Sequence, residues 1–427
     1  MTNDQVQTFE IEKVVAGGFG LARHDGRVVL VRGAIPGEVV RARVQRTGKG
    51  GVLFADVVDV LEPSADRVEP ATDPRCGGLA FAHVRYARQL NLKADLLRDA
   101  LRRTGRVPEP PPFEVMASPL EGWRLRARLH VVDGQVGFFR EGTHSLCPPP
   151  ASQLPAHMRE AAQAVVEVIP AAVQPSIAGV VVAEDVASTS RAVHVDLREQ
   201  ARIPQWQADL PLGVAGLSVA RSGRRDLGQV LGHPLLHEPL AALCGQAVDG
   251  TLVWQPGGFF QANRFVLPHL VQAVLAQLDE SPVVDLFAGV GLFGVCAAAT
   301  GQAAVCCVEG DGISGEALQI NAAPFGGRVD VLRQPVETFV SERRLHLDAA
   351  VVVVDPPRTG LPPRVAAALC EASPARVVYV SCDPPTFARD VRQLTAAGYA
   401  LRSLAAFDMF PGTAHLETLA VLERPSS

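Results

Sequence analysis

Cys382 is the residue whose surroundings most directly suggest chemistry. It follows the apolar run at 377–380, and a helical stretch from Phe387 to Ala396 comes next. A thiol near a helix N-terminus is favoured as the thiolate, because the helix dipole stabilises negative charge there. Isolated cysteines are also common as small buried hydrophobic residues. The position therefore predicts either a nucleophile or a structural residue of the core.

Two acidic residues stand in similar places. Asp355 ends the apolar run at 351–354 and precedes two prolines, and Glu417 precedes the last apolar run at 418–422. In open α/β sheets, ligands bind beyond the carboxyl ends of the strands, so we expect Asp355 and Cys382 at one edge of a sheet. The alternatives are a surface position for Glu417 and an Asp355 that only caps its own loop.

A glycine-rich turn, DLFAGVGLFG at 285–294, follows an earlier apolar run. Its glycines permit a tight turn and a close approach of the backbone to a ligand at the start of a helix. Glu309 ends the next apolar run, 20 residues beyond Gly289, where a carboxylate can accept both hydroxyls of a ribose. A nicotinamide dinucleotide could use the same geometry. With Asp285, however, the turn resembles the first motif of class I S-adenosylmethionine-dependent methyltransferases, whose cofactor has no pyrophosphate.

These residues must be positioned by the elements between them. Apolar runs alternate with helical stretches throughout the last third of the chain, which is typical of a βαβ series with a buried parallel sheet. The predicted strands are 283–287, 303–308, 349–354 and 376–380, and the predicted helices are 294–299, 314–321 and 364–371.

The first 62 residues have a different pattern. Short β-type runs alternate with glycine turns over residues 8–62, which predicts a small antiparallel barrel. The motifs at 17–20 (GGFG) and 35–38 (IPGE) resemble a TRAM domain, an OB-like RNA-binding barrel found on RNA-modifying enzymes. Four cations without an intervening acid suit phosphates, although they also suit a solvated edge strand. These cations are Arg41, Arg43, Arg46 and Lys49.

The middle of the chain carries basic segments but no chemical motif of its own. Residues 86–106 have helical spacing, and the window 85–106 holds seven cations against two acids, a net charge of +5. Arg124, Arg126 and Arg128 alternate with apolar residues before an Asp133-Gly134 turn, which predicts a β-hairpin with one basic face. RNA contact and a solvated sheet face both fit that pattern. Residues 150–250 mix helical and strand-like runs and predict a mixed central domain.

Four motifs in order resemble the RNA uracil-C5 methyltransferase family. They are FFQAN at 259–263, DPPRTG at 355–360, YVSCDP at 379–384 and DMFPGTAHLE at 408–417. The resemblance implies S-adenosylmethionine as cofactor, Cys382 as the nucleophile that adds to C6 of uracil, and Glu417 as the base that removes the C5 proton. A thiolate is needed because uracil C5 is a poor nucleophile until C6 has been attacked. The expected cofactor residues are Gln261, Phe287, Leu292, Glu309, Asp355 and, by its position after the third strand, Gln334.

The chain departs from this family at a metal site. Many members carry an iron–sulfur cluster on four cysteines. Cys76 and Cys147 match two of these, but Leu79 and Pro70 stand where the other two would be. We therefore expect no metal site, with packing in place of the cluster. A zinc site made by Cys76, Cys147, His83 and His144 is the alternative, although its ligand spacing is irregular.

Composition bounds the remaining possibilities. The chain has 427 residues, a net charge of −5 and 48% hydrophobic residues, which suits two or three globular domains and excludes wholesale disorder. No apolar run nears 18 residues and no signal sequence opens the chain, so a soluble, cytoplasmic protein without membrane contact is expected. The eight cysteines lack the spacing of a disulfide framework, which predicts reduced thiols.

The resulting hypothesis is a multi-domain α/β protein. It has an OB-like TRAM barrel at 1–62, a mixed α+β central domain at 63–250 and a Rossmann-like class I methyltransferase domain at 251–427. We expect a monomer that acts on RNA, and 23S rRNA is favoured over the T-loop of tRNA because such a barrel usually accompanies ribosomal enzymes. The alternatives are a non-catalytic RNA-binding protein or chaperone with vestigial motifs, and a methyltransferase for DNA or small molecules.

Overall fold

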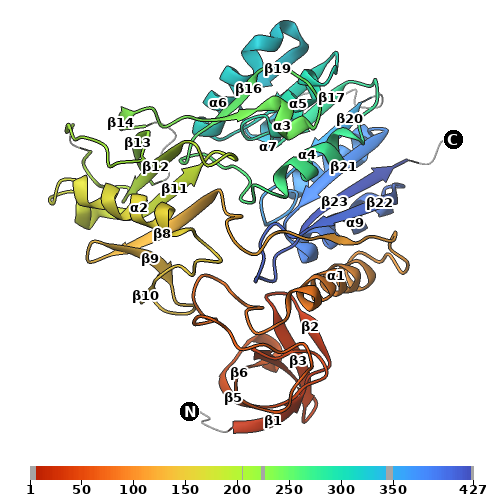
Figure 1. Cartoon of the computed structure of the whole chain (residues 1–427). Helices are drawn as coiled ribbons and strands as arrows, with labels where there is room; N and C mark the ends of the chain where they lie inside the picture. Colours follow the sequence, from red (N-terminus) through yellow and green to blue (C-terminus); the bar gives the residue numbers. More distant parts are fainter. Residues whose placement is uncertain (1–5, 204, 223–226, 343–349, 425–427) are drawn as a thin grey trace.

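The computed structural model describes residues 6–203, 205–222, 227–342 and 350–424. The described part contains three large sheets that follow one another along the chain (Figure 1). Residues 1–5 and 425–427, and Ala349 of one predicted strand, lie outside the described residues. Among the described residues, no helix combines the length and apolar character that crossing a membrane requires.

The N-terminal sheet has six strands in the order β1-β5-β6-β4-β3-β2 and curls around its own apolar core (Figure 1). β4 pairs with β6 in parallel, so the prediction of a purely antiparallel sheet is wrong at this pair. The reason is the path of the chain after β5. β6 pairs with β5 in antiparallel and then lies beside β4, where it runs in the same direction as β4. The bounds are β1 (Val6–Glu10), β2 (Lys13–Val15), β3 (Phe19–His24), β4 (Arg27–Arg32), β5 (Val39–Thr47) and β6 (Leu53–Glu62), with a 3-10 turn at Lys49–Gly51.

Helix α1 (Tyr86–Arg103) and the short strand β7 (Val115–Met116) pack against the C-terminal part of the chain. The apolar face of α1 lies against helix α9 (Pro384–Ala396), and β7 pairs with β22 (Ala400–Phe407). Several charges of the basic window are engaged. Lys93 is fully buried with Asp408, and Arg103 pairs with Asp99. The +5 window is therefore only partly available to a ligand.

The central sheet has seven strands in the order β10-β9-β8-β11-β12-β13-β14, and helix α2 covers one face (Figure 1). The predicted hairpin at Asp133-Gly134 is present between β8 and β9. Asp133 adopts the left-handed conformation (φ 51°) that this turn requires. The bounds are β8 (Arg126–Val132), β9 (Gln135–Phe139), β10 (Leu146–Cys147), α2 (Ala156–Val168), a 3-10 turn (Gln174–Ser176), β11 (Ile177–Glu184), β12 (Arg191–Leu197), β13 (Gly216–Arg221) and β14 (Gln229–Gly232).

The C-terminal sheet has eight strands in the order β19-β18-β17-β20-β21-β23-β22-β7. The predicted βαβ series is present, and the five strands from β19 to β21 are parallel. The chain order reverses at β17, so the ends of β17 and β20 open a crevice, which is where open α/β sheets bind ligands. The bounds are α4 (Leu267–Leu275), β17 (Val283–Leu286), α5 (Leu292–Ala299), β18 (Val305–Val308), α6 (Gly312–Ala322), a 3-10 segment (Ala323–Arg328), β19 (Val329–Leu332), α7 (Val336–Glu342), β20 (Val351–Val354), α8 (Pro363–Ala372), β21 (Arg376–Ser381) and β23 (Glu417–Glu423).

A small two-stranded sheet, which begins before residue 251, packs into the C-terminal core. β15 (Leu236–Pro239) pairs with β16 (Thr251–Trp254), and α3 (Leu240–Cys244) lies between them in sequence. Buried side chains of this segment belong to the same apolar cluster as α4 and α5. The predicted boundaries at 62 and 250 stay predictions, but α1, β7 and residues 236–254 all pack with the C-terminal sheet.

Candidate active site

The glycine-rich turn after β17 is held by two carboxylates. Glu309 accepts the Gly289 N–H (2.7 Å), and Asp285 accepts the Gly294 N–H (2.8 Å). Gly291 has a φ of 88°, and a Cβ there would lie 2.6 Å from Leu318. The turn therefore requires glycine at this position. Complete burial raises the pKa of Asp285 to about 8.

A hollow of about 530 Å³ opens at the carboxyl ends of the parallel strands. Six of the predicted site residues line it, namely Gln261, Phe287, Glu309, Asp355, Cys382 and Glu417. Leu292 lines a narrower hollow that also touches Gln261 and Phe287. Gln334 is not among the residues that line either hollow. It lies after β19, next to the backbone of Gly310, and a contact between Gln334 and a cofactor stays a prediction.

Cys382 lies between the end of β21 and the first turn of α9. Burial, together with the nearby carboxylates of Glu417 and Asp355, raises the pKa of the Cys382 thiol to about 12. The expectation that the helix start favours the thiolate is therefore wrong for the ligand-free protein. One reason is local, because α9 begins with Pro384 and Pro385, which have no N–H groups to offer.

The carboxylates of the buried Glu417 and the half-buried Asp355 line the same hollow as the thiol. Burial raises the pKa of Asp355 to about 7, while a hydrogen bond from the Gln261 amide (3.2 Å) opposes that shift. Burial and the Asp355 carboxylate raise the pKa of Glu417 well above its ordinary value. One Glu417 carboxylate oxygen has no hydrogen-bond partner among the described residues. A group with these properties is a strong proton acceptor once it is ionised.

Burial also lowers the pKa of His415 to about 4, with Arg358 and Lys93 contributing positive charge. The imidazole is therefore neutral near pH 7. His415 does not line the hollow that holds Cys382 and Glu417.

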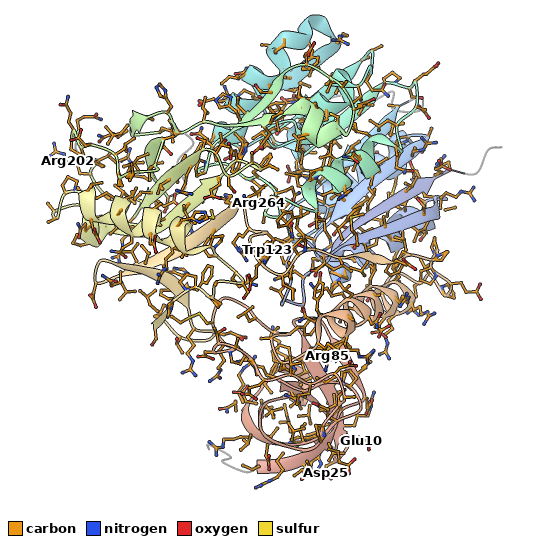
Figure 2. All side chains as sticks on the ribbon, in the orientation of Figure 1. Glu10, Asp25, Arg85, Trp123, Arg202 and Arg264 are labelled. Carbon is orange, nitrogen blue, oxygen red and sulfur yellow. A yellow bond between two sulfur atoms is a disulfide. The ribbon has the colours of Figure 1, made fainter. Side chains whose placement is uncertain are left out.

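The loop that supplies Gln261 is anchored between the central and C-terminal sheets. Arg264 donates to the buried Glu184 (2.9 Å), and its backbone N–H donates to the Trp123 carbonyl (2.9 Å). Figure 2 shows Trp123 and Arg264 where these two parts of the chain meet. The Asn263 amide donates to Ser118 (2.8 Å). The FFQAN motif is therefore held by residues far from it in sequence.

The turn that leads into Glu417 is held by α1. The Lys93 ammonium forms a fully buried ion pair with Asp408 and donates to the Phe410 carbonyl (3.0 Å). Gln89 accepts the Gly412 N–H (3.0 Å). Sequence reasoning assigned Lys93 to a basic surface and missed this contact. The available signal was its place among Leu92, Leu96 and Leu97 on the apolar face of the helix.

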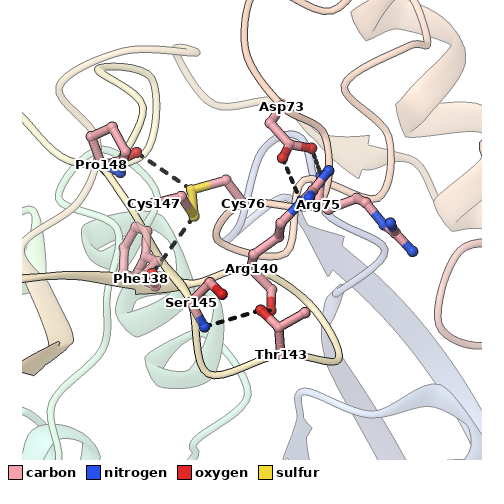
Figure 3. Close-up of a disulfide and its surroundings, with 9 residues drawn as sticks. All are labelled: Asp73, Arg75, Cys76, Phe138, Arg140, Thr143, Ser145, Cys147 and Pro148. Carbon is pink, nitrogen blue, oxygen red and sulfur yellow. Dashed lines mark hydrogen bonds and ion pairs between the residues drawn. A yellow bond between two sulfur atoms is a disulfide. The ribbon is translucent and has the colours of Figure 1, made fainter. Parts of the chain in front are cut away.

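Cys76 and Cys147 form a disulfide (Figure 3). The expectation of reduced thiols is therefore wrong for this pair, because the fold brings the two Cα atoms within 6.0 Å. The other six cysteines form no disulfide. No group of three or more His, Cys, Asp or Glu side chains among the described residues could hold a metal ion, so the zinc alternative has no site there.

The disulfide lies close to the turn that precedes Glu417. On one side of the bond, the Phe81 N–H donates to the Gly412 carbonyl (2.9 Å). On the other side, the Gln153 amide donates to the Pro411 carbonyl (2.9 Å). The bond therefore joins two segments that both contact residues 410–413.

Comparison with known proteins gives a consistent picture. The sequence profile of the TRAM domain matches residues 2–58, and that of tRNA (Uracil-5-)-methyltransferase matches residues 342–425. An RNA methyltransferase of Streptomyces coelicolor is 34% identical over 97% of this chain and 92% of its own length. The 23S rRNA (uracil(1939)-C(5))-methyltransferase RlmD of Halomonas elongata is 36% identical over 98% of this chain and 89% of its own.

The fold also matches a solved structure over nearly its whole length. The tRNA (uracil-54, C5)-methyltransferase of Pyrococcus abyssi, solved with S-adenosyl-L-homocysteine, superimposes with a TM-score of 0.71. The match covers 97% of this chain and 99% of that one at 24% sequence identity. At this identity the likeness shows a shared fold.

Proposed function

Because this chain belongs to the RNA uracil-C5 methyltransferase family, we propose that it methylates C5 of a uridine in 23S rRNA through a covalent adduct with Cys382. The observation that carries the proposal is that Cys382 and Glu417 line one hollow together with four of the expected cofactor residues, Gln261, Phe287, Glu309 and Asp355. A structural role for the thiol alone would not require two carboxylates beside it.

The residues present fit S-adenosylmethionine. The Gly289 position leaves open space, Glu309 lines the hollow with a carboxylate suited to accept the hydroxyls of a ribose, and Gln261, Phe287, Leu292 and Asp355 surround the adjoining hollow. When bound, this cofactor would supply an electrophilic methyl group and a positive charge. Positive charge favours the ionised forms of buried acids, and the raised pKa values of Cys382 and Asp355 leave room for that effect.

Each protein group then has one task. The Cys382 thiolate forms a bond to C6 of the uracil, which moves electron density to C5. After C5 has gained its methyl group, the Glu417 carboxylate takes the C5 proton, and the bond between sulfur and C6 breaks to restore the thiolate and the ring double bond. A carboxylate with a raised pKa is suited to that proton transfer.

The mechanism is tested with RNA that carries 5-fluorouridine at the target. At C5 the base finds fluorine in place of the proton and cannot remove it, so the thiolate is not eliminated. The wild-type protein should therefore accumulate a denaturant-resistant adduct, whereas Cys382→Ala should form none. Cys370→Ala is the matched control, because Cys370 is a half-buried cysteine on α8 away from the hollow. Normal methylation by Cys382→Ala would refute the assignment.

Glu417→Gln separates the base from the nucleophile. This variant should still attack and methylate but release the product slowly, so that an adduct containing the transferred methyl accumulates. Rapid turnover would move the base role elsewhere, with His415 as the next candidate.

Support for 23S rRNA comes from the Halomonas relative, whose printed name gives that target, and from the N-terminal TRAM match. The tRNA T-loop is the second candidate, since the family profile and the structural neighbour carry tRNA names. Mapping 5-methyluridine in rRNA and tRNA from cells with and without the gene distinguishes the two. We propose residues 1–62 as the part that binds RNA at a distance from the hollow.

A further inference from the structure

A second hollow, of about 440 Å³, lies where three parts of the chain meet. The N-terminal part contributes residues 15–17, and the C-terminal part contributes residues 383–385 and 413–415. The part between them contributes Gly78, Ala80 and Glu141 and, from α1 and the residue after it, Leu96, Asp99, Ala100, Arg103 and Thr104. This second hollow shares no lining residue with the hollow that holds Cys382. Its wall nevertheless includes Asp383, the immediate neighbour of Cys382, and His415, two residues before Glu417. A volume of this size is in the range of small-molecule sites.

The chemistry of this hollow does not suit a phosphate. The start of α9 offers no N–H donors in its first two positions, because both residues are proline. The basic groups at the hollow are engaged. Arg103 pairs with Asp99 (2.8 Å), which also pairs with Lys13 (2.8 Å). The remaining lining is largely small and apolar, with proline rings and alanines, which suits the face of a nucleobase.

One carboxylate oxygen at the hollow accepts no hydrogen bond among the described residues. Of the three carboxylates at the hollow, Asp99 is neutralised as described, and Glu141 pairs with Arg32 (2.9 Å). Asp383 has no ion pair among the described residues. One of its carboxylate oxygens caps α9 by accepting the Thr386 N–H (3.0 Å) and the Thr386 hydroxyl (2.9 Å), and the other has no hydrogen bond there. A lone carboxylate oxygen accepts from an exocyclic amino group, as carboxylates do from the cytosine amino group.

The covalent continuity of the RNA chain indicates which group occupies this hollow. If the target uridine reaches Cys382, its neighbours in the same RNA chain must pass the residues beside Cys382 and Glu417, because consecutive nucleotides are joined by phosphates. Sequence-specific proteins bind single-stranded RNA by splaying out such unstacked bases and reading their edges. We propose that this hollow binds the base of a nucleotide next to the target uridine, with Asp383 accepting a hydrogen bond from the exocyclic amino group. This inference rests on the proposed function.

The test uses synthetic fragments of the RNA shown to be methylated, in which the target uridine is kept and each neighbouring nucleotide is varied among the four bases. For wild-type protein, fragments with an amino-bearing base at one of the neighbouring positions should have a KM about tenfold lower than fragments with uracil there. This is the difference expected for one hydrogen bond to a charged group. The rate at saturating RNA should change little. Equal KM values for all four bases at every neighbouring position would overturn the proposal.

Two variants test the residues. Asp383→Asn retains a good helix cap, and because its oxygen is needed for capping, the amide nitrogen would face the hollow as a donor. The preference for amino bases should then disappear or reverse. Ala100→Phe fills the hollow from α1 and should raise KM for every fragment, with unchanged affinity for S-adenosylmethionine. Ala87→Phe, an exposed position on the same helix, is the matched control.

The outcomes separate this inference from the proposed function. If wild-type protein methylates no RNA fragment, the proposed function fails. If it methylates the fragments but Ala100→Phe has the same KM as wild type, the second hollow is not an RNA site and only this inference fails. Should Asp383→Asn not fold, the Ala100→Phe and Ala87→Phe pair still decides the matter.

Discussion

Removing the Cys76–Cys147 disulfide should destabilise the protein without removing a catalytic group. The bond closes a loop with a sequence separation of 71 residues. In the chain-entropy description, a loop of this length restricts the unfolded chain enough to stabilise the folded state by about 4 kcal/mol. The perturbation is the double substitution Cys76→Ser/Cys147→Ser. It should lower the melting temperature by about 10 °C if the affected region unfolds as one unit.

The assay compares unfolding with and without dithiothreitol. Wild-type protein should melt at a lower temperature in the reductant, whereas the double variant should melt at that lower temperature in both buffers. Cys370→Ser is the control, because Cys370 forms no disulfide and the variant should keep the sensitivity of the wild type to reductant. Methyl transfer well below the melting transition should survive, because the turn at 410–413 keeps its hydrogen bonds to Gln89 and Lys93.

A thiol count provides the direct check. Protein purified without reductant and then denatured should react with six equivalents of an alkylating agent, corresponding to the six cysteines that form no disulfide. The same preparation should contain no stoichiometric iron, since two thiols cannot supply the four ligands of a cluster. Eight reactive thiols, or an unchanged melting temperature on reduction, would refute the reasoning. Four irons per chain would show that the family's cluster persists despite Leu79 and Pro70.

Three other measurements test the remaining electrostatics. Lys93→Met should lower the free energy of unfolding, measured in urea, by about 3–5 kcal/mol, because Asp408 is left buried without its partner. The double variant Lys93→Met/Asp408→Leu should recover part of that loss. Equal stability of wild type and Lys93→Met would argue against a buried ion pair. The rate of Cys382 alkylation by iodoacetamide in ligand-free protein should rise about tenfold per pH unit between pH 7 and 9, because the thiol pKa of about 12 lies above that range. At a given pH, Glu417→Gln should react faster, since it removes a negative charge that raises this pKa, and a slower reaction would contradict the assigned cause. The double variant Arg41→Gln/Arg46→Gln should raise KM for RNA and leave the cofactor affinity unchanged. The slope of log affinity against log salt concentration should become shallower by about 0.7–0.9 for each lost phosphate contact. An unchanged slope would mean that these exposed side chains do not contact the RNA.

The sequence alone determined the features that depend on local patterns. The βαβ series can be recognised in the sequence because buried parallel strands are short apolar runs, and the helices between them keep a period of 3.6 residues. The glycine turn at 285–294 can be recognised because its backbone conformation restricts the residue type. Glu309 can be recognised because it stands at the end of a strand. The motifs around Cys382 and Glu417 identified the family because each is a contiguous run of residues.

The tertiary structure decided what depends on distant neighbours. Periodicity places Lys93 on a helix face, but only packing reveals that Asp408, more than 300 residues later, shares its buried site. The same holds for Cys76 and Cys147, which no local pattern pairs, and for the parallel contact of β4 with β6. The thiol pKa of Cys382 is also set at a distance, because burial and two carboxylates from other parts of the chain raise it. Charge and desolvation act through space, whereas sequence patterns report only neighbours along the chain.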